Sequence, residues 1–441
     1  MDISHTLLSG ANSIKSEISV SAGETESEVN KSYYRLMLYA AIFGALASLV
    51  TVGYITLYNL GVKFFGQPTL FILNINLWPL ILLGIAGVFI GLAIKFFGQH
   101  GGLGVAQIQY AQTGGINYRN VPSILLQGFI ALWSGAAVGP EGSLVFLTGG
   151  LGTFLSQRLK LQKDDLQVLV YSAIAGAFGG FFGSPIVGAV GAVEYMFIKE
   201  LNWYRHLAPG LVAAAVGYGV YSAILHTSYL GVYDFPDFAT LRIVDLGWAL
   251  LVGIIAGLVG ILYKLVFGLV HRGFGRLNKK PVVRAIIGGL IIGLIGSFLP
   301  LTLYSGQEQL EEIVRNPAQF GIGILLLMLL VKILLTSTSF ATGFVGGPIF
   351  PLLFIGGTLG QLLSVFLTFI PQGVGVLAGM AGATCAFLPL PLTVALLLGL
   401  FGGQTDLIPV IVIGAVTGFI ISKAFTPRLS KLAARSGSSK Q

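Results

Sequence analysis

Charged residues are scarce in this sequence. Only 10% of the residues are Asp, Glu, Lys or Arg, whereas about a quarter is usual in a soluble domain. Apolar tracts such as "LILLGIAGVFIGLAIKFF" at 80–97 reach the length of a membrane-spanning helix. The scarcity of charge therefore excludes an ordinary soluble domain, whose surface would need more polar residues. It predicts an all-α polytopic membrane protein.

Cysteine is almost absent, which excludes a disulfide scaffold. The single residue, Cys385, lies in an apolar tract and is predicted to be a small buried packing residue. The apolar segments carry no metal-binding motif and no nucleophile–histidine pair. We therefore expect no metal ion, no organic cofactor and no enzymatic activity. The net charge of +8 is clustered beside apolar segments, so it predicts no nucleic-acid binding.

A signal peptide pattern is also absent, because residues 1–30 are polar and mildly acidic. Basic clusters at 271–284 and near the C-terminus contrast with the acidic stretch 226–245. Since positive loops stay in the cytoplasm, both termini are predicted to be cytoplasmic. The absence of a targeting peptide and of regulatory domains suggests a prokaryotic plasma membrane. The expected parts are a soluble, partly disordered tail (1–30), a first transmembrane half (31–225), an extracellular linker (226–243), a second transmembrane half (244–425) and a cytoplasmic C-terminal tail without soluble domains (426–441).

Two stretches, 208 residues apart, share one pattern: "GPEGSLVFLTGGLG" at 139–152 and "GPIFPLLFIGGTLG" at 347–360. Seven of the fourteen positions are identical. Chance matching in a chain rich in Leu and Gly is one explanation, and an internal duplication with inverted halves is the other.

Several apolar segments are too short to cross a bilayer, which favours helices that end inside the membrane.

Each copy has the features of a helix start, because Pro is favoured in the first turn. The first backbone N–H groups of a helix lack internal partners and carry partial positive charge. Two such starts that meet inside the membrane would form an anion site without a full positive charge. Amides of this kind bind an anion and also release it.

Glu141 is the only charged residue between Arg119 and Arg158. A carboxylate inside a bilayer costs at least about 2.5–3.5 kcal/mol. At an anion site it would act as a tethered competitor that swings out or takes up a proton, and we predict that it is the gate. The alternative is a carboxylate that caps a helix near the lipid headgroups.

These residues resemble motifs of the CLC family of chloride channels and proton-coupled chloride antiporters. "GPEGS" is similar to its G-(R/K)-E-G-P motif, "GGPIFP" at 346–351 to its G-x-F-x-P motif, and "GGLGVAQIQ" at 101–109 to its G-S-G-I-P segment. "SPIVGAVGAVEYM" at 184–196 resembles the segment that ends in paired glutamates. The resemblance covers about residues 31–425. It implies a homodimer with one anion pathway per subunit and about 18 helices per subunit, many of them re-entrant.

The resemblance assigns the gate to Glu141 and the anion contacts to residues of four segments. These are Gly142, Ser143, Leu103, Gly104, Ile349, Phe350 and either Gln404 or Thr405. Some positions depart from the family pattern. Leu103 replaces a serine and offers no hydroxyl group, and Pro348 has no N–H where an N–H usually faces the anion.

In proton-coupled members an inner glutamate relays protons, and the corresponding position here is Tyr195. Tyrosine, with a pKa near 10, is a poor proton carrier at neutral pH. Glu194 could substitute if its side chain reaches the same path, and the other explanation is a residue at a helix end whose head reaches the interface.

The sequence thus predicts transport of chloride or a similar small anion, with passive or loosely coupled flow. The alternative is a proton-coupled antiporter of chloride or another anion. A more distant alternative is a secondary transporter of organic anions with another fold, which also would show inverted repeats and broken helices. The expected partners are the anion, protons in the antiporter case, the lipid bilayer and a second copy of the chain.

Overall fold

The computed structural model describes residues 3–66, 68–72, 75–102, 104–196, 203–226, 232–233, 235 and 240–438. Within these ranges it describes only the backbone of 3–31, 203–204 and 426–438. The described residues form sixteen α-helices and one small hairpin. The prediction of an all-α protein is therefore confirmed.

The first eight helices follow the first half of the chain. They are α1 (Ile3–Gly66), α2 (Trp78–Phe97), α3 (Val105–Thr113), α4 (Val121–Ser134), α5 (Glu141–Arg158), α6 (Lys163–Phe181), α7 (Pro185–Tyr195) and α8 (Ala208–Leu225). The hairpin of β1 (Phe71–Ile72) and β2 (Ile75–Asn76) follows α1. A π-helical turn at Trp203–Leu207 precedes α8, and a 3-10 turn at Tyr118–Asn120 precedes α4.

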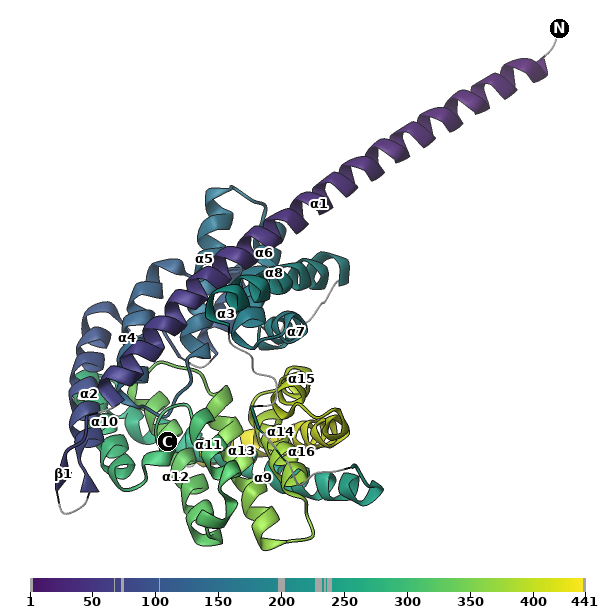
Figure 1. Cartoon of the computed structure of the whole chain (residues 1–441). Coiled ribbons are helices and arrows are strands. Elements are labelled where there is room, and N and C mark those ends of the chain that lie inside the picture. The colour runs from purple at the N-terminus through teal and green to yellow at the C-terminus, as the bar shows by residue number, and fades with distance from the viewer. Residues whose placement is uncertain are drawn as a thin grey trace.

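The other eight helices follow the second half. They are α9 (Ile243–Gly275), α10 (Pro281–Phe298), α11 (Gln307–Arg315), α12 (Ile322–Thr342), α13 (Ile349–Phe366), α14 (Gln372–Phe387), α15 (Pro391–Gly402) and α16 (Ile408–Ser438). Three 3-10 turns lie between them, at Pro300–Thr302, Pro317–Gln319 and Thr405–Leu407. In Figure 1 most helices of the first half lie above those of the second half, and α2 lies beside α10.

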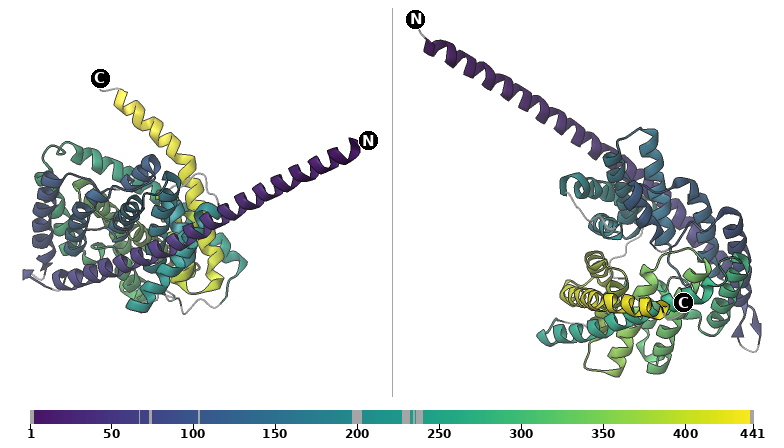
Figure 2. Two further views of the ribbon diagram at one scale, coloured as in Figure 1. Left: turned by 90° about the horizontal axis from the view of Figure 1, so that it is seen from above. Right: turned by 180° about the vertical axis from the view of Figure 1, so that it is seen from behind.

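The two halves repeat one packing scheme. Helix α1 packs on α6 and α8, and α9 packs on α14 and α16 in the same way. Helix α2 packs on α10 and α7 on α15, so these helices meet their own counterparts. Such self-pairing places an approximate two-fold axis between the halves, and the right-hand view of Figure 2 shows the same division from behind. The internal duplication is confirmed.

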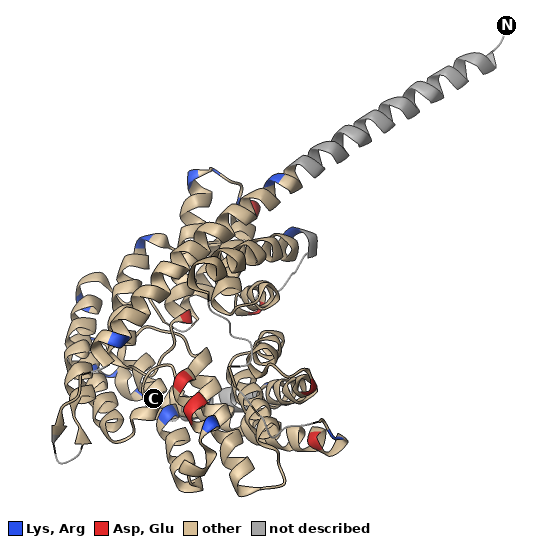
Figure 3. Ribbon diagram, viewed as in Figure 1, with Lys and Arg blue, Asp and Glu red and all other residues tan. Residues whose placement is uncertain are grey.

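Eight segments of the described chain are long and apolar enough to cross a membrane. The first begins at Ser32, inside α1, and the last ends at Phe425, inside α16. Helices α7, α14 and α15 have only 11, 16 and 12 residues, and they are apolar but shorter than a bilayer crossing needs. Figure 3 shows that most of the ribbon carries no charged residue. The chain is an integral multi-pass membrane protein with broken helices.

The helix count differs from the expected number of about 18. Helix α1 continues without a break into residues 3–31, where we expect a partly disordered tail, and α16 continues to Ser438. The apolar tracts do not predict α3 or α11, because "VAQIQYAQT" and "QEQLEEIVR" are short and rich in polar residues.

Glycines set the close spacing of α1, α6 and α8. A Cβ atom on Gly176 of α6 would lie 2.5 Å from Cα of Gly44, and one on Gly217 would lie 2.2 Å from the carbonyl oxygen of Gly176. Real Cβ atoms essentially never approach so closely, so only glycine allows this spacing. Cys385 is buried in α14, as predicted.

Candidate functional site

The two glycine–proline turns of the repeat face each other. The N–H of Gly139 donates to the carbonyl oxygen of Gly347 at 2.8 Å, and the N–H of Gly347 donates back at 2.7 Å. These glycines occupy equivalent positions in the two copies, 208 residues apart. The pairing therefore brings the starts of α5 and α13 together, each with a proline at its N-cap.

Glu141, the first residue of α5, is fully buried at this junction. Its Oε1 atom accepts a hydrogen bond from the N–H of Ile349, the first residue of α13, at 2.7 Å. The backbone N–H groups of Phe350 and of Glu141 itself lie near this carboxylate. Its Oε2 atom has no hydrogen-bond partner among the described residues, and no ion pair there includes Glu141. The side chain that opens α5 is thus held by a backbone N–H group at the start of α13.

Close packing fixes the backbone around the carboxylate. A Cβ atom on Gly142 would lie 2.1 Å from the carbonyl oxygen of Gly346, so a side chain there would separate the two turns. Ser143 is fully buried, close to Gly128 of α4. The hydroxyl group of Tyr54 on α1 donates to the carbonyl oxygen of Pro140 at 3.1 Å. The start of α5 is therefore held from three sides.

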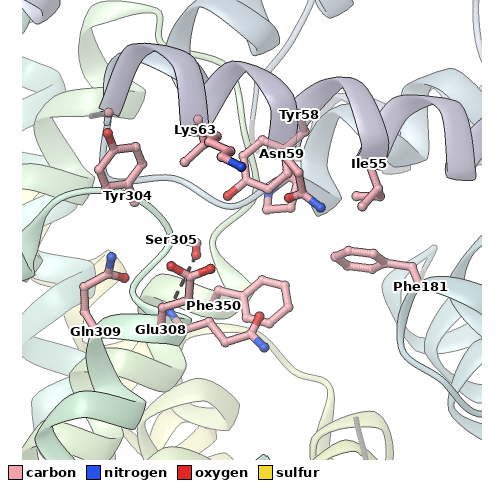
Figure 4. A pocket seen from close by; sticks show the side chains of 14 residues that line it. Ile55, Tyr58, Asn59, Lys63, Phe181, Tyr304, Ser305, Glu308, Gln309 and Phe350 are labelled. Carbon is pink, nitrogen blue, oxygen red and sulfur yellow. Dashed lines mark hydrogen bonds between the residues drawn. The ribbon is translucent and has the colours of Figure 1, made fainter. Parts of the chain in front are cut away.

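A cavity of about 590 Å³ reaches this junction from one side. Figure 4 shows Tyr58, Asn59 and Lys63 of α1 on one wall and Glu308 of α11 on the other. Pro140 and Phe350, the neighbours of Glu141 and Ile349, also line the cavity. The cavity therefore reaches the residues next to the carboxylate, while Glu141 itself is fully buried.

Sequence reasoning missed Lys332, which supports the wall of this cavity. Its Nζ atom, fully buried, donates to the carbonyl oxygens of Thr302, Leu303 and Tyr304 at 3.1, 3.1 and 2.8 Å. It also lies 4.9 Å from the ring centre of Phe354. Three acceptors match the three donors of an ammonium group. The signal in the sequence is a lysine inside the apolar run 322–342.

Lys332 holds the backbone turn at Tyr304. Its φ of 56° is the left-handed conformation, which is uncommon for a non-glycine residue. Its N–H donates to the carbonyl oxygen of Gly135, and its side chain lines the cavity. Lys332 therefore stabilises a turn that the local sequence alone would not favour.

The segment at the start of α3 is described only in part. Leu103 lies outside the described residues. Gly104 is the N-cap of α3 with a φ of 82°, and a Cβ atom there would meet no other atom within 4 Å. The anion contacts of Leu103 and Gly104 stay predictions.

Gln404 and Thr405 contact residues other than those of the Glu141 site. The Gln404 side-chain amide donates to the carbonyl oxygen of Phe235 at 3.4 Å, and Thr405 is exposed at the turn before α16. None of their described contacts is with Glu141 or Ile349. The structure therefore joins Glu141, Gly142, Ser143, Ile349 and Phe350 in one site and gives no contact between that site and Gln404 or Thr405.

Glu194 and Tyr195 have different partners. The Glu194 carboxylate accepts from the N–H of Leu392 at 3.1 Å and from the N–H and hydroxyl groups of Thr393 at 2.7 and 2.6 Å. Glu194 thus caps α15, a helix of the other half. Tyr195 is buried, and its ring lies edge-on to the ring of Phe178, with 6.0 Å between the ring centres. Among the described hydrogen bonds, none joins either residue to Glu141.

Comparisons with known proteins give a family and a fold. The family described as "Voltage gated chloride channel" matches residues 86–423. YfeO, a protein named for ion transport from Salmonella choleraesuis (strain SC-B67), is 29% identical over 377 residues, which are 81% of this chain and 86% of YfeO. YfeO of Salmonella newport (strain SL254) is also 29% identical, over 373 residues.

Two solved structures share the fold. One is a CLC-type fluoride/proton antiporter, 21% identical, with a TM-score of 0.73 over 89% of this chain and 96% of that chain. The other is a slow cyanobacterial Cl⁻/H⁺ antiporter, 20% identical, with a TM-score of 0.75 over 92% of this chain and 99% of that chain.

Proposed function

Because the chain belongs to the CLC family of voltage gated chloride channels, we propose that it conducts chloride or a similar small anion past Glu141. The family supports anion transport in general. The single observation that carries the proposal is the 2.7 Å hydrogen bond from the Ile349 N–H group to Oε1 of Glu141. The carboxylate occupies amides that a free anion would use.

The proposed gate is a competition for these amides. A hydrogen bond with a charged partner contributes about 1.5–3 kcal/mol, so the tethered carboxylate excludes a free anion while it is ionised. A proton on Glu141 removes its charge and weakens its hold on the Ile349 N–H group. A chloride ion then binds at the helix starts, which attract it without a full positive charge and also release it.

The surroundings of Glu194 support passive or loosely coupled flow. Its carboxylate is engaged by three donors of α15, and the neighbouring Tyr195 is a poor proton carrier. Neither residue offers a ready inner proton relay. The alternative, a proton-coupled antiporter, is supported by the buried carboxylate itself, which is able to take part in anion and proton exchange.

We further propose the setting of this pathway. The basic cluster at 271–284 and the basic C-terminal segment favour cytoplasmic termini. The proposed location is a prokaryotic plasma membrane. The family resemblance implies two copies of the chain, each with its own pathway. The protein acts as a transporter and not as an enzyme, with no cofactor.

Ion flux from liposomes tests the proposal. Purified protein is reconstituted with internal KCl, flow is started with valinomycin, and external chloride and pH are recorded together. Variants Glu141→Gln and, as a matched control, Glu312→Gln on the exposed side of α11 are measured alongside. We expect chloride efflux with little proton movement in the wild type, and faster efflux in Glu141→Gln alone.

Two outcomes would reject parts of this account. Proton uptake in fixed ratio to chloride, abolished by Glu141→Gln, would replace passive flow with antiport. The proposed function as a whole would be contradicted if chloride, fluoride and nitrate all moved no faster than in protein-free liposomes.

A further inference from the structure

A second cavity, of about 530 Å³, lies between α2, α9, α10 and α12. It shares no lining residue with the cavity at Glu141. Its polar lining comes from Lys95, Gln99, His271, Asn278 and Arg284. These residues lie at the ends of the helices and in the segments that join them. The cavity therefore opens where the membrane-spanning segments end.

The lining of this cavity has positive charge and no carboxylate. Lys95 and Arg284 are cationic, His271 is able to become so, and no Asp or Glu is among the lining residues. None of the ion pairs found in the described chain involves these three residues. Their charge is thus not balanced by an acidic side chain in the part of the protein that the structure describes.

Of the three basic residues, Arg284 is the best positioned to bind an anion. Only 5% of its surface is exposed, and a guanidinium group buried without a counter-charge is costly. Its Nη1 atom donates to Oδ1 of Asn278 and its Nη2 atom donates to Oε1 of Gln99, each at 2.6 Å. Both acceptors are neutral amides, so they orient the guanidinium group without neutralising it. Its Nε atom has no partner among the described residues.

Two neighbouring features add to this preference for an anion. Arg284 lies in the first turn of α10, an 18-residue helix whose start at Pro281 also lines the cavity, and helix starts favour negative charge. The Nδ1 atom of His271 lies 3.0 Å from the carbonyl oxygen of Phe267. If Nδ1 carries the proton of that bond, Nε2 is left for another partner.

We infer that this cavity binds a phosphate group, carried by an anionic phospholipid or by a free phosphate. The planar guanidinium group matches phosphate oxygens, and basic pockets between membrane helices bind lipid phosphates. A volume of about 530 Å³ is larger than one halide ion needs and falls within the roughly 300–1,000 Å³ of small-molecule sites. The inference is independent of the proposed anion pathway.

Thermal unfolding of the full-length protein in detergent tests the inference. The probes are phosphatidylglycerol, phosphatidylcholine with the same acyl chains, and sodium phosphate against sodium chloride at equal ionic strength. We expect phosphatidylglycerol or sodium phosphate to raise the Tm, and phosphatidylcholine and sodium chloride not to do so. A shift with sodium phosphate alone identifies free phosphate as the ligand, and a shift with phosphatidylglycerol identifies the lipid.

Variants locate the bound phosphate. The double change Lys95→Gln with His271→Gln removes two basic groups without touching the bonds of Arg284, and we expect at least a tenfold weaker apparent affinity for the active probe. Arg284→Lys tests the guanidinium group. If Arg284→Lys does not fold, the double variant alone tests the inference. Arg119→Gln, at an exposed position between α3 and α4, is the matched control and should bind like the wild type. Equal binding by the double variant and the wild type, or no Tm shift with any probe, would overturn the inference.

Discussion

The starts of α5 and α13 have the same backbone frame and different chemistry. Both helices contain 18 residues, begin after a Gly-Pro turn and meet through the paired residues Gly139 and Gly347. At the first helical position, one copy has Glu141 and the other has Ile349. The duplicated frame thus supplies two converging helix starts, and in the proposed function a single residue makes one of them the gate and the other the donor.

Helices α7 and α15 show a second departure from symmetry. The start of α7 is capped locally, because Ser184 accepts from the N–H group of Val187 at 3.4 Å. The start of α15 has no side-chain cap of its own and receives the carboxylate of Glu194 instead. The two halves therefore pack symmetrically but differ in their polar contacts. Mutations can test each of these differences.

The largest effect is expected where the two copies touch. Gly142→Val places a Cβ atom where only 2.1 Å separates it from the carbonyl oxygen of Gly346. The cost should exceed the roughly 1–3 kcal/mol of ordinary overpacking, because the atom that is met belongs to the backbone. We expect little monodisperse protein in size-exclusion chromatography.

Gly219→Val is the control for this change. A Cβ atom on Gly219 in α8 would meet nothing within 4 Å, so the same substitution should be tolerated there. Wild-type yield and flux from Gly142→Val would show that the two turns do not need their close contact.

The second-largest effect is expected from removing the carboxylate of Glu141, which distinguishes the two copies of the repeat. Glu141→Ala deletes a charge-assisted hydrogen bond of about 1.5–3 kcal/mol, so anion flux at pH 7.5 should rise roughly tenfold or more. In the wild type, flux should rise as the pH falls, because protonation neutralises the competitor. In the variant, flux should be independent of pH. A pH response that survives in Glu141→Ala would assign the gate to another group.

Exchanging the residues of the two copies sharpens the comparison. Glu141→Ile alone should abolish the pH response of the flux. Adding Ile349→Glu puts a carboxylate at the equivalent helix start, and the two-fold frame predicts that part of the pH response returns. Ile349→Gln in the Glu141→Ile background is the neutral control. If the double variant with glutamate behaves like this control, the two helix starts are not interchangeable.

The smallest effect is expected at the cap of α15. Glu194→Gln leaves fewer acceptors for the three donors of Leu392 and Thr393, which should cost about 1–3 kcal/mol of stability and lower the Tm. Flux and its pH response should stay at wild-type values. Loss of proton movement with an unchanged Tm would instead identify Glu194 as a proton relay.

The sequence predicts much of this arrangement, and the failures have physical reasons. The apolar tracts locate fourteen of the sixteen α-helices, because membrane helices need long apolar stretches. The repeat suggests an anion site where its two helix starts meet, and the family resemblance assigns Glu141 and Ile349 to that site. Lys332 was missed because its three partners are backbone carbonyl groups about 30 residues away, and such acceptors leave no mark in a sequence. The cap formed by Glu194 was missed for the same reason, since two of its donors are backbone N–H groups nearly 200 residues away.

A crystal structure of Glu141→Gln grown in bromide would test the central claim most directly, beside the wild type under the same conditions. Bromide stands in for chloride and is located by its anomalous scattering. The account predicts a bromide ion within hydrogen-bond distance of the Ile349 N–H group in the variant, at the place where the wild type holds its own carboxylate. A variant without bromide there, or a wild type that holds bromide and the carboxylate on that amide together, would contradict the claim that Glu141 competes with the anion.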